Sequence, residues 1–204
     1  MAQMGRPRRF DRDKAIDQAL HLFWEQGYEA TSLTQLKAAI GGGISAPSFY
    51  AAFASKEALF QECARRYLSQ YATVTEYLWD TGLAPRPALE TALRASAKMQ
   101  CERGHPKGCM VALAVMSAPS PENAAVTQSL TQSRTRTRAG ITGCIERGIA
   151  DGELAPTTDA RALATVFDGF LLGLSTLARD GVGYPVLNAA IDRIMTAWDT
   201  ARDR

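Results

Sequence analysis

The stretch from Thr31 to Phe60 limits what this chain can fold into more than any other part of the sequence. Ser32 precedes an apolar-periodic run and Gln35 stands three residues later, which is the capping box of a helix start. Apolar residues then recur at helical spacing for two turns. Three glycines, residues 41–43, must end the helix because glycine loses too much backbone entropy inside one. The spacing predicts a short helix that stops at a tight turn.

A second short helix follows the glycines, and a longer one follows that. Ser45 can cap the second helix, with Pro47 in its first turn, where a missing N–H does no harm. Phe49 and Phe53 give this helix an apolar side, and Ser55 can cap the next. Helix, tight turn, helix is the geometry that places its second member in the major groove of DNA. The stretch therefore predicts DNA binding.

Three strings around this motif resemble TetR-family transcriptional regulators. They are GYEATS at residues 27–32, PSFYAAF at 47–53 and SKEALF at 55–60. The resemblance covers the family's N-terminal domain over roughly residues 11–60, and the remainder resembles the family in architecture and a few short strings. Two features depart from the pattern: residues 41–44 lengthen the turn, and Ala51 and Ala52 stand where most members carry a histidine.

The candidate DNA contacts fall into three groups. The second helix of the motif is the recognition helix. Its first turn, where base edges are usually contacted, holds Ser45, Ala46, Pro47 and Ser48. The resemblance implies phosphate contacts from Tyr50 and Lys56, and the preceding helix can reach the DNA backbone through Ser32, Gln35 and Lys37. A basic N-terminal arm can enter the minor groove through Arg6 and Arg8.

The rest of the chain also predicts helices, with no strand-like alternation. One helix is expected to run unbroken over residues 56–79 and to belong to both halves of the protein. We expect an all-α fold of about nine helices. A three-helix DNA-binding domain with its basic arm would occupy residues 1–56, and a helical effector-binding and dimerisation domain would occupy residues 57–204.

The last two predicted helices are the most apolar and suggest a two-fold, four-helix dimer interface. The resemblance also implies a homodimer formed through these helices. The predicted interface residues are Phe167, Phe170, Leu171, Leu174, Val186, Leu187, Ile191, Ile194 and Trp198.

A cysteine–histidine segment before residue 110 allows two kinds of sensor. Cys101, His105 and Cys109 have C-x3-H-x3-C spacing, which suits Zn(II) or Cu(I). Cys109 alone, near a helix start and close to Lys107, would have a lowered pKa and a reactive thiol. The Gly-Cys-hydrophobic string here resembles one in copper-responsive and thiol-based branches of the family. A small buried apolar residue is the third interpretation of Cys109.

A pocket inside the helical bundle is the other sensor hypothesis. Aromatic and methionine side chains suit a small apolar or planar effector. The candidate lining residues are Tyr67, Tyr71, Met99, Cys109, Met110, Leu113, Met116 and Phe170.

The favoured function is a sequence-specific DNA-binding regulator, a repressor released from a palindromic operator by a small effector. The alternative is a redox- or metal-responsive repressor that senses through Cys109. An all-helical enzyme is disfavoured because the sequence has no His-Glu-x-x-His motif and no phosphate loop. The net charge of +2 requires local placement of positive charge for DNA binding. We expect a cytoplasmic protein without a cofactor or a membrane span.

Overall fold

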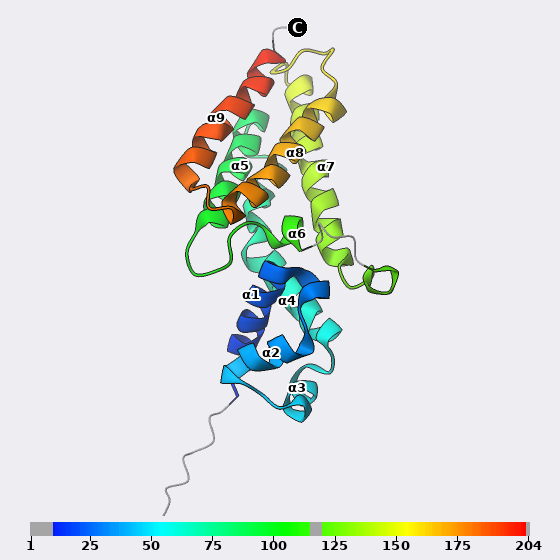
Figure 1. Cartoon of the computed structure of the whole chain (residues 1–204). Helices are drawn as coiled ribbons and strands as arrows, with labels where there is room; N and C mark the ends of the chain where they lie inside the picture. Colours follow the sequence, from blue (N-terminus) through cyan, green and yellow to red (C-terminus); the bar gives the residue numbers. More distant parts are fainter. Residues whose placement is uncertain (1–9, 115–119, 203–204) are drawn as a thin grey trace, which may run out of the picture.

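Helices make up all the regular structure of residues 10–114 and 120–202, which are the residues that the computed structural model describes. The predicted all-α fold is confirmed (Figure 1). The N-terminal helices are α1 (Arg12–Ala30), α2 (Leu33–Ala39), the 3-10 helix η1 (Ile40–Gly42), α3 (Ala46–Phe53) and α4 (Lys56–Gln70). The remaining helices are η2 (Ala72–Trp79), α5 (Pro85–Cys101), α6 (Met110–Leu113), η3 (Pro121–Asn123), α7 (Gln128–Ala150), α8 (Ala160–Arg179) and α9 (Tyr184–Thr200).

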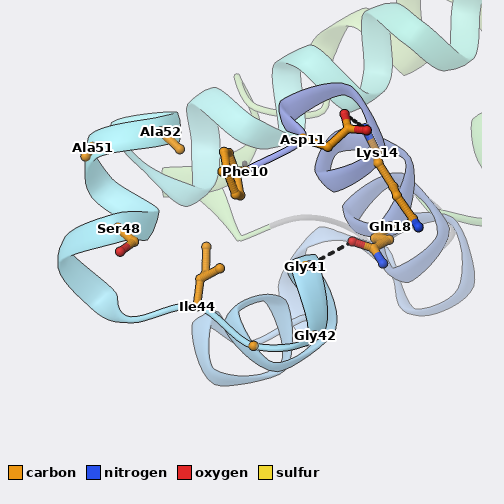
Figure 2. A pocket seen from close by; sticks show the side chains of 11 residues that line it. Phe10, Asp11, Lys14, Gln18, Gly41, Gly42, Ile44, Ser48, Ala51 and Ala52 are labelled. Atoms are coloured by element: carbon orange, nitrogen blue, oxygen red, sulfur yellow. Dashed lines mark hydrogen bonds between the residues drawn. The ribbon is translucent and has the colours of Figure 1, made fainter. Parts of the chain in front are cut away.

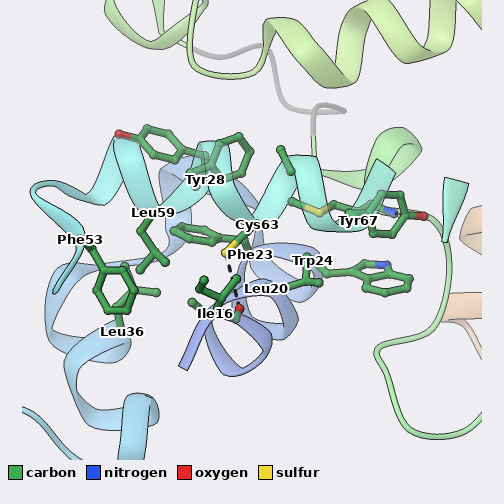
Figure 3. Close-up of a cluster of buried hydrophobic side chains, with 14 of the residues drawn as sticks. Ile16, Leu20, Phe23, Trp24, Tyr28, Leu36, Phe53, Leu59, Cys63 and Tyr67 are labelled. Atoms are coloured by element: carbon green, nitrogen blue, oxygen red, sulfur yellow. Dashed lines mark hydrogen bonds between the residues drawn. The ribbon is translucent and has the colours of Figure 1, made fainter. Parts of the chain in front are cut away.

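The first hydrophobic core joins α1 to the helices of the predicted DNA-binding motif (Figure 3). Ile16, Leu20 and Phe23 of α1 lie one turn apart and are buried against residues such as Leu36 of α2 and Leu59 of α4. Burying such side chains contributes about 1.5–3 kcal/mol each to folding. The apolar stripe read from the sequence of α1 is therefore the core of this half.

Ion pairs fasten α1 to α4 on the outside of this core. Arg12 binds both carboxylate oxygens of Glu62, at 2.8 and 2.6 Å. Arg66 of α4 binds Asp13 at 2.6 Å and Asp17 at 2.8 Å. These pairs are partly exposed, so each contributes little to stability alone, but bidentate geometry fixes the relative orientation of the two helices.

The unbroken helix predicted over residues 56–79 is wrong. The α-helix α4 ends at Gln70, Tyr71 takes φ −107° and ψ −37°, and the chain continues as the 3-10 helix η2. The β-branched run from Thr73 to Thr75 has poor helix propensity, which favours a break at this point. The Thr75 hydroxyl also donates to the carbonyl of Ala72 at 3.0 Å, in competition with the backbone.

The second core lies within the bundle of α5, α7, α8 and α9 (Figure 1). It corrects part of the predicted dimer interface, because five of those side chains are already buried inside one chain: Phe167, Leu174, Leu187, Ile191 and Trp198. A side chain without exposed surface has none to bury against a second copy. A helix that is apolar on several sides, as α8 is, first buries apolar side chains within the bundle of its own chain.

By length and composition alone, α8 is apolar enough to cross a membrane, although the sequence was expected to contain no such segment. The buried Phe167 and Leu174 contribute to that apolar character, and both belong to the second core. The core helix of a bundle passes the same test, so this one helix is weak support for a membrane span.

Gly148 of α7 leaves room for an indole ring. A Cβ at this position would lie 2.7 Å from Cζ2 of the buried Trp198, whereas a Cβ at Gly143 on the same helix would meet nothing within 4 Å. We predict that Gly148→Ala lowers the free energy of unfolding by about 1–3 kcal/mol through overpacking. Gly143→Ala, the control, raises it by about 0.5–1 kcal/mol because alanine is the better helix former. Urea unfolding at one fixed protein concentration measures both changes, and equal effects would contradict this packing.

Candidate nucleic-acid interface and internal cavity

The turn before α3 depends on three consecutive glycines with positive φ. Gly41, Gly42 and Gly43 have φ of 62°, 80° and 111°, in the region that side chains rarely adopt. The turn is also tied at both ends. The N–H of Gly41 donates to Oε1 of Gln18 on α1 at 2.9 Å, and the N–H of Ile44 donates to the carbonyl of Lys37 at 2.9 Å. The lengthened turn is therefore an ordered connection that sets where α3 begins.

The first turn of α3 presents small polar groups. The Ser45 hydroxyl caps the helix by accepting from the N–H of Ser48 at 3.2 Å, and the two hydroxyls lie 2.9 Å apart. Ser45, Pro47 and Ser48 are exposed and Ala46 is half-buried, while Phe49 beneath them is fully buried. The predicted cap is confirmed, and the face predicted to meet base edges lies open.

Tyr50 and Lys56 lie in different surroundings. Tyr50 is 50% exposed, which rules out a place in the core. Lys56 is half-buried, with its Nζ 4.2 Å from the centroid of the Tyr28 ring. Burial lowers the pKa of Lys56, and the carboxylate of Glu29 partly opposes that effect.

The candidate residues on α2 have structural partners as well as exposure. The amide N–H of Ser32 donates to Oε1 of Gln35 at 2.7 Å, and the amide N–H of Gln35 donates to the Ser32 hydroxyl at 3.2 Å. This confirms the predicted capping box. Both residues remain exposed, and Lys37 is half-buried in the last turn of α2. Arg6 and Arg8 lie outside the described residues.

An open groove of about 1150 Å³ runs beside the recognition helix (Figure 2). It lies between the start of α1, the glycine turn and α3. Lys14 lines it and is exposed, which adds a cation on the side of the groove opposite Ser48. Sequence reasoning missed Lys14 and Gln18 because both belong to α1, outside the helix-turn-helix pattern. Arg12, two residues before Lys14, is instead held by Glu62.

The metal hypothesis fails for Cys101, His105 and Cys109. The Cys101 thiol lies 3.6 Å from the carbonyl of Val182, and the His105 ring stacks on Trp24 at 4.6 Å between centroids. The Cys109 sulfur instead accepts from the Tyr67 hydroxyl at 3.2 Å. No set of three metal-binding side chains is assembled anywhere in the described residues. The loop turns at two glycines with positive φ, Gly104 and Gly108, and thereby directs the three side chains to different partners.

The expected lowering of the Cys109 pKa is also wrong. Burial raises the pKa of the Cys109 thiol, although the hydrogen bond from Tyr67 and the N–H groups of Ala112 and Val111 act in the opposite direction. Lys107 is engaged elsewhere, since its Nζ donates to the backbone carbonyls of Cys101 and Glu102. Lys107 is thus close to Cys109 in the sequence but does not lie next to its thiol.

A cavity of about 50 Å³ lies among α4, η2, α5, α6, α7 and α8. Three of the predicted residues line it: Tyr67, Met99 and Cys109. Four others do not, because they pack elsewhere: Tyr71 lies edge-to-face with Trp24 and stacks on Tyr67, Met110 belongs to the first core, Leu113 lies against Gly108, and Phe170 packs on the second core. Met116 lies outside the described residues.

Sequence reasoning missed the polar side of this cavity. Ser96 and Gln100 of α5 and Asp168 of α8 line it, and all three residues are buried. A signal was present for the first two, because they interrupt the apolar stripe of α5 at i and i+4. Asp168 lies within the apolar helix α8, and only the folded structure shows that it pairs with Arg138.

Comparisons with known proteins find relatives along most of the chain. A family model described as bacterial regulatory proteins, tetR family, matches residues 15–63, and one described as tetracyclin repressor-like, C-terminal domain, matches residues 85–180. The HTH-type transcriptional repressor ComR of Escherichia coli is 31% identical over 195 residues, which cover 95% of this chain and 91% of ComR.

Solved structures agree with the sequence comparisons. A cysteine-substituted form of the TetR family regulator CifR, complexed with 26-base-pair operator DNA, superposes with a TM-score of 0.80. It is 39% identical, and the match covers 95% of this chain and 100% of that one. A putative TetR regulator from Rhodococcus sp. RHA1 is 33% identical, with a TM-score of 0.57 and coverage of 92% and 97%. On these matches along nearly its whole length, the chain belongs to the TetR family of bacterial regulatory proteins.

Proposed function

We propose that this protein is a dimeric transcriptional repressor that binds a palindromic operator and is released from it by a small-molecule effector. The exposed first turn of α3 is the observation that carries the proposal. Ser45, Ser48 and Tyr50 face outward, while Phe49 and Phe53 hold the helix in the core. A helix that is packed against the core on one face and exposed on the other can enter a major groove without unfolding.

The relatives support this function. ComR and BdcR of Escherichia coli are both named as transcriptional repressors, and BdcR is 34% identical over 107 residues. CifR has been solved with double-stranded operator DNA. The similar proteins are thus DNA-binding regulators, and none of these names describes an enzyme.

In the proposed complex, α3 supplies base contacts and its surroundings supply phosphate contacts. The base-facing residues would be Ser45, Ala46, Pro47 and Ser48. The phosphate-facing residues would be Ser32, Gln35, Lys37, Tyr50 and Lys56, with Arg6 and Arg8 in the minor groove. Few of the base-facing side chains are long donors, so DNA shape and bridging water would carry much of the specificity.

The proposed dimer forms through the outer face of α8 together with exposed parts of α9. Val166 and Leu177 of α8 are 46% and 43% exposed, and Gly169 and Gly173 lie between them on the same face with no atom near an added Cβ. Val186 of α9 is 62% exposed. A stripe of small and apolar residues lets a second helix approach closely, and two copies of it would make the isologous contact that a palindrome requires.

Signal transfer is proposed to run from residues 57–204, which hold the cavity, to the DNA-binding residues 1–56. Tyr67 of α4 lines the cavity, and the N-terminal end of the same helix adjoins α3. A shift of α4 would change the spacing of the two recognition helices, and the operator tolerates only one spacing. Such a regulator would act in the cytoplasm, where its DNA is.

A thiol-responsive repressor is the second candidate, because Cys109 both lines the cavity and contacts Tyr67. Modification of this thiol would alter the same part of the cavity lining that a bound effector would contact. Its raised pKa means that reaction would depend on a small thiolate fraction at neutral pH.

Tyr50→Phe tests the DNA contact. Loss of the hydroxyl should weaken binding to all DNA sequences by about tenfold, since a hydrogen bond to a charged phosphate is worth about 1.5 kcal/mol or more. Tyr77→Phe, at the similarly exposed Tyr77 of η2, is the control and should have no effect. Gel shifts with an operator selected by the wild-type protein from random DNA measure both, and equal affinities would remove Tyr50 from the interface.

Gly173→Glu tests the dimer face. The monomer has room for the side chain, but a buried charge would block the second copy, so sedimentation should show a monomer. Operator affinity should fall roughly a hundredfold or more because the second half-site no longer binds intramolecularly. Gly143→Glu, on α7 and equally open, should remain dimeric. A dimeric Gly173→Glu protein would place the interface elsewhere.

Iodoacetamide mapping tests the thiol candidate. Because the Cys109 pKa is raised, labelling should be slow at pH 7 and accelerate as the pH rises. Tyr67→Phe should slow it further at a given pH, because the hydrogen bond from Tyr67 lowers the thiol pKa and its loss raises that pKa. Tyr71→Phe, with the hydroxyl removed from the neighbouring ring, is the control. Equal labelling rates for Cys63, Cys101, Cys109 and Cys144 would contradict a special role for Cys109.

A further inference from the structure

We propose that the cavity binds a small neutral molecule with a hydroxyl or amide N–H group, which donates to Oε1 of Gln100 and forms a hydrogen bond with Oγ of Ser96. This inference rests on the proposed function, because it names the chemical class of the effector. It replaces the apolar or planar ligand expected from the sequence with a short molecule that has one polar end.

Two polar side chains of α5 carry the inference. Ser96 and Gln100 are each 2% exposed, and Ser96 Oγ and Gln100 Oε1 have no hydrogen-bond partner among the residues that the structure describes. They stand one turn apart on the same helix face, and both line the cavity. A buried polar atom without a partner is costly, so such atoms are normally satisfied by protein, water or ligand. Here both lie against one hollow, which places their missing partner inside it.

The size of the cavity limits the ligand. About 50 Å³ corresponds to roughly four water positions, far below the several hundred cubic ångströms of a drug-sized pocket. Met99, Val111 and Leu171 form an apolar part of the lining. A molecule that fills this space therefore has a short carbon chain next to its polar group.

The charges around the cavity favour a neutral ligand. The buried carboxylate of Asp168 is already paired, since Nε of Arg138 donates to it at 2.7 Å. Arg134 is a cation of the lining itself. Both signs are thus present around the cavity, whereas the two unpartnered atoms belong to uncharged side chains. An uncharged donor meets Gln100 Oε1 without the desolvation cost of an ion.

The cavity adjoins an outer groove between η2 and α7. An open groove of about 270 Å³ on the outside shares four lining residues with the cavity: Ala72, Thr75, Ser133 and Thr137. One wall of this groove is η2, a 3-10 helix of eight residues, which is longer than such helices usually run. In this proposal the shared wall between η2 and α7 is where a small molecule would enter.

Butanamide and 2-pentanone test the proposal as a matched pair. They have the same size and shape, but only butanamide carries N–H donors. Titration of the 204-residue protein, followed by saturation-transfer NMR, should show butanamide binding about tenfold more tightly. Water solvates the amide better than the ketone, so a preference for the amide must come from hydrogen bonds inside the protein. Equal affinity, or binding of neither probe, overturns the proposal and leaves a cavity filled by water.

Variants assign the preference to the two side chains. Gln100→Leu removes the acceptor at nearly constant size and should abolish the tenfold preference, and Ser96→Ala, which adds no bulk, should reduce it. Gln128→Leu, at an exposed position at the start of α7, is the control and should keep it. A preference retained in Gln100→Leu would contradict the assignment. Gel shifts of the same variants without probe report on the proposed function separately, because DNA binding does not require an occupied cavity.

Discussion

Trp24 lies at the junction between the DNA-binding half of this protein and the helical bundle, and hydrogen bonds of its ring and its backbone connect the two. Its indole N–H donates to the carbonyl of Gly108 at 3.1 Å, and its own carbonyl accepts from Arg179 at the end of α8 at 3.0 Å. Gly108 must be glycine: a Cβ there would lie 2.7 Å from the carbonyl oxygen of Ser175. The loop before α6 is therefore clamped between α1 and α8, and the DNA-binding half shares its core with the bundle.

This clamp connects the cavity to the candidate DNA face by short steps. The Tyr67 hydroxyl donates to the Cys109 sulfur and accepts from the N–H of Met110, both at 3.2 Å. Tyr67 belongs to α4, which ion pairs tie rigidly to α1. A ligand that pushes on this wall would move α1 and α4 together, so the DNA-binding half would tilt as a unit. Because the helix breaks at Tyr71, η2 packs with the bundle and does not continue α4.

Sequence patterns predicted local structure well and side-chain partners poorly. The capping groups of Ser32, Ser45 and Ser55 and the glycine turn depend on residues a few positions apart, so they could be read directly. The continuous helix through Tyr71 was predicted because no glycine or proline marks its break. The polar lining at Ser96 and Gln100 was visible only as an interruption of an apolar stripe.

The sequence by itself determined the all-helical fold, the helix-turn-helix and the family, because helix caps, apolar periodicity and family motifs are local in the chain. Only the tertiary structure decided which apolar side chains fill the monomer. Phe167 and Trp198 are buried there, while Val166 and Leu177 remain exposed, although all four look alike in the sequence. It also decided that Cys101, His105 and Cys109 point to separate partners. Partner choice is set by packing between distant segments, and spacing along one segment does not contain that information.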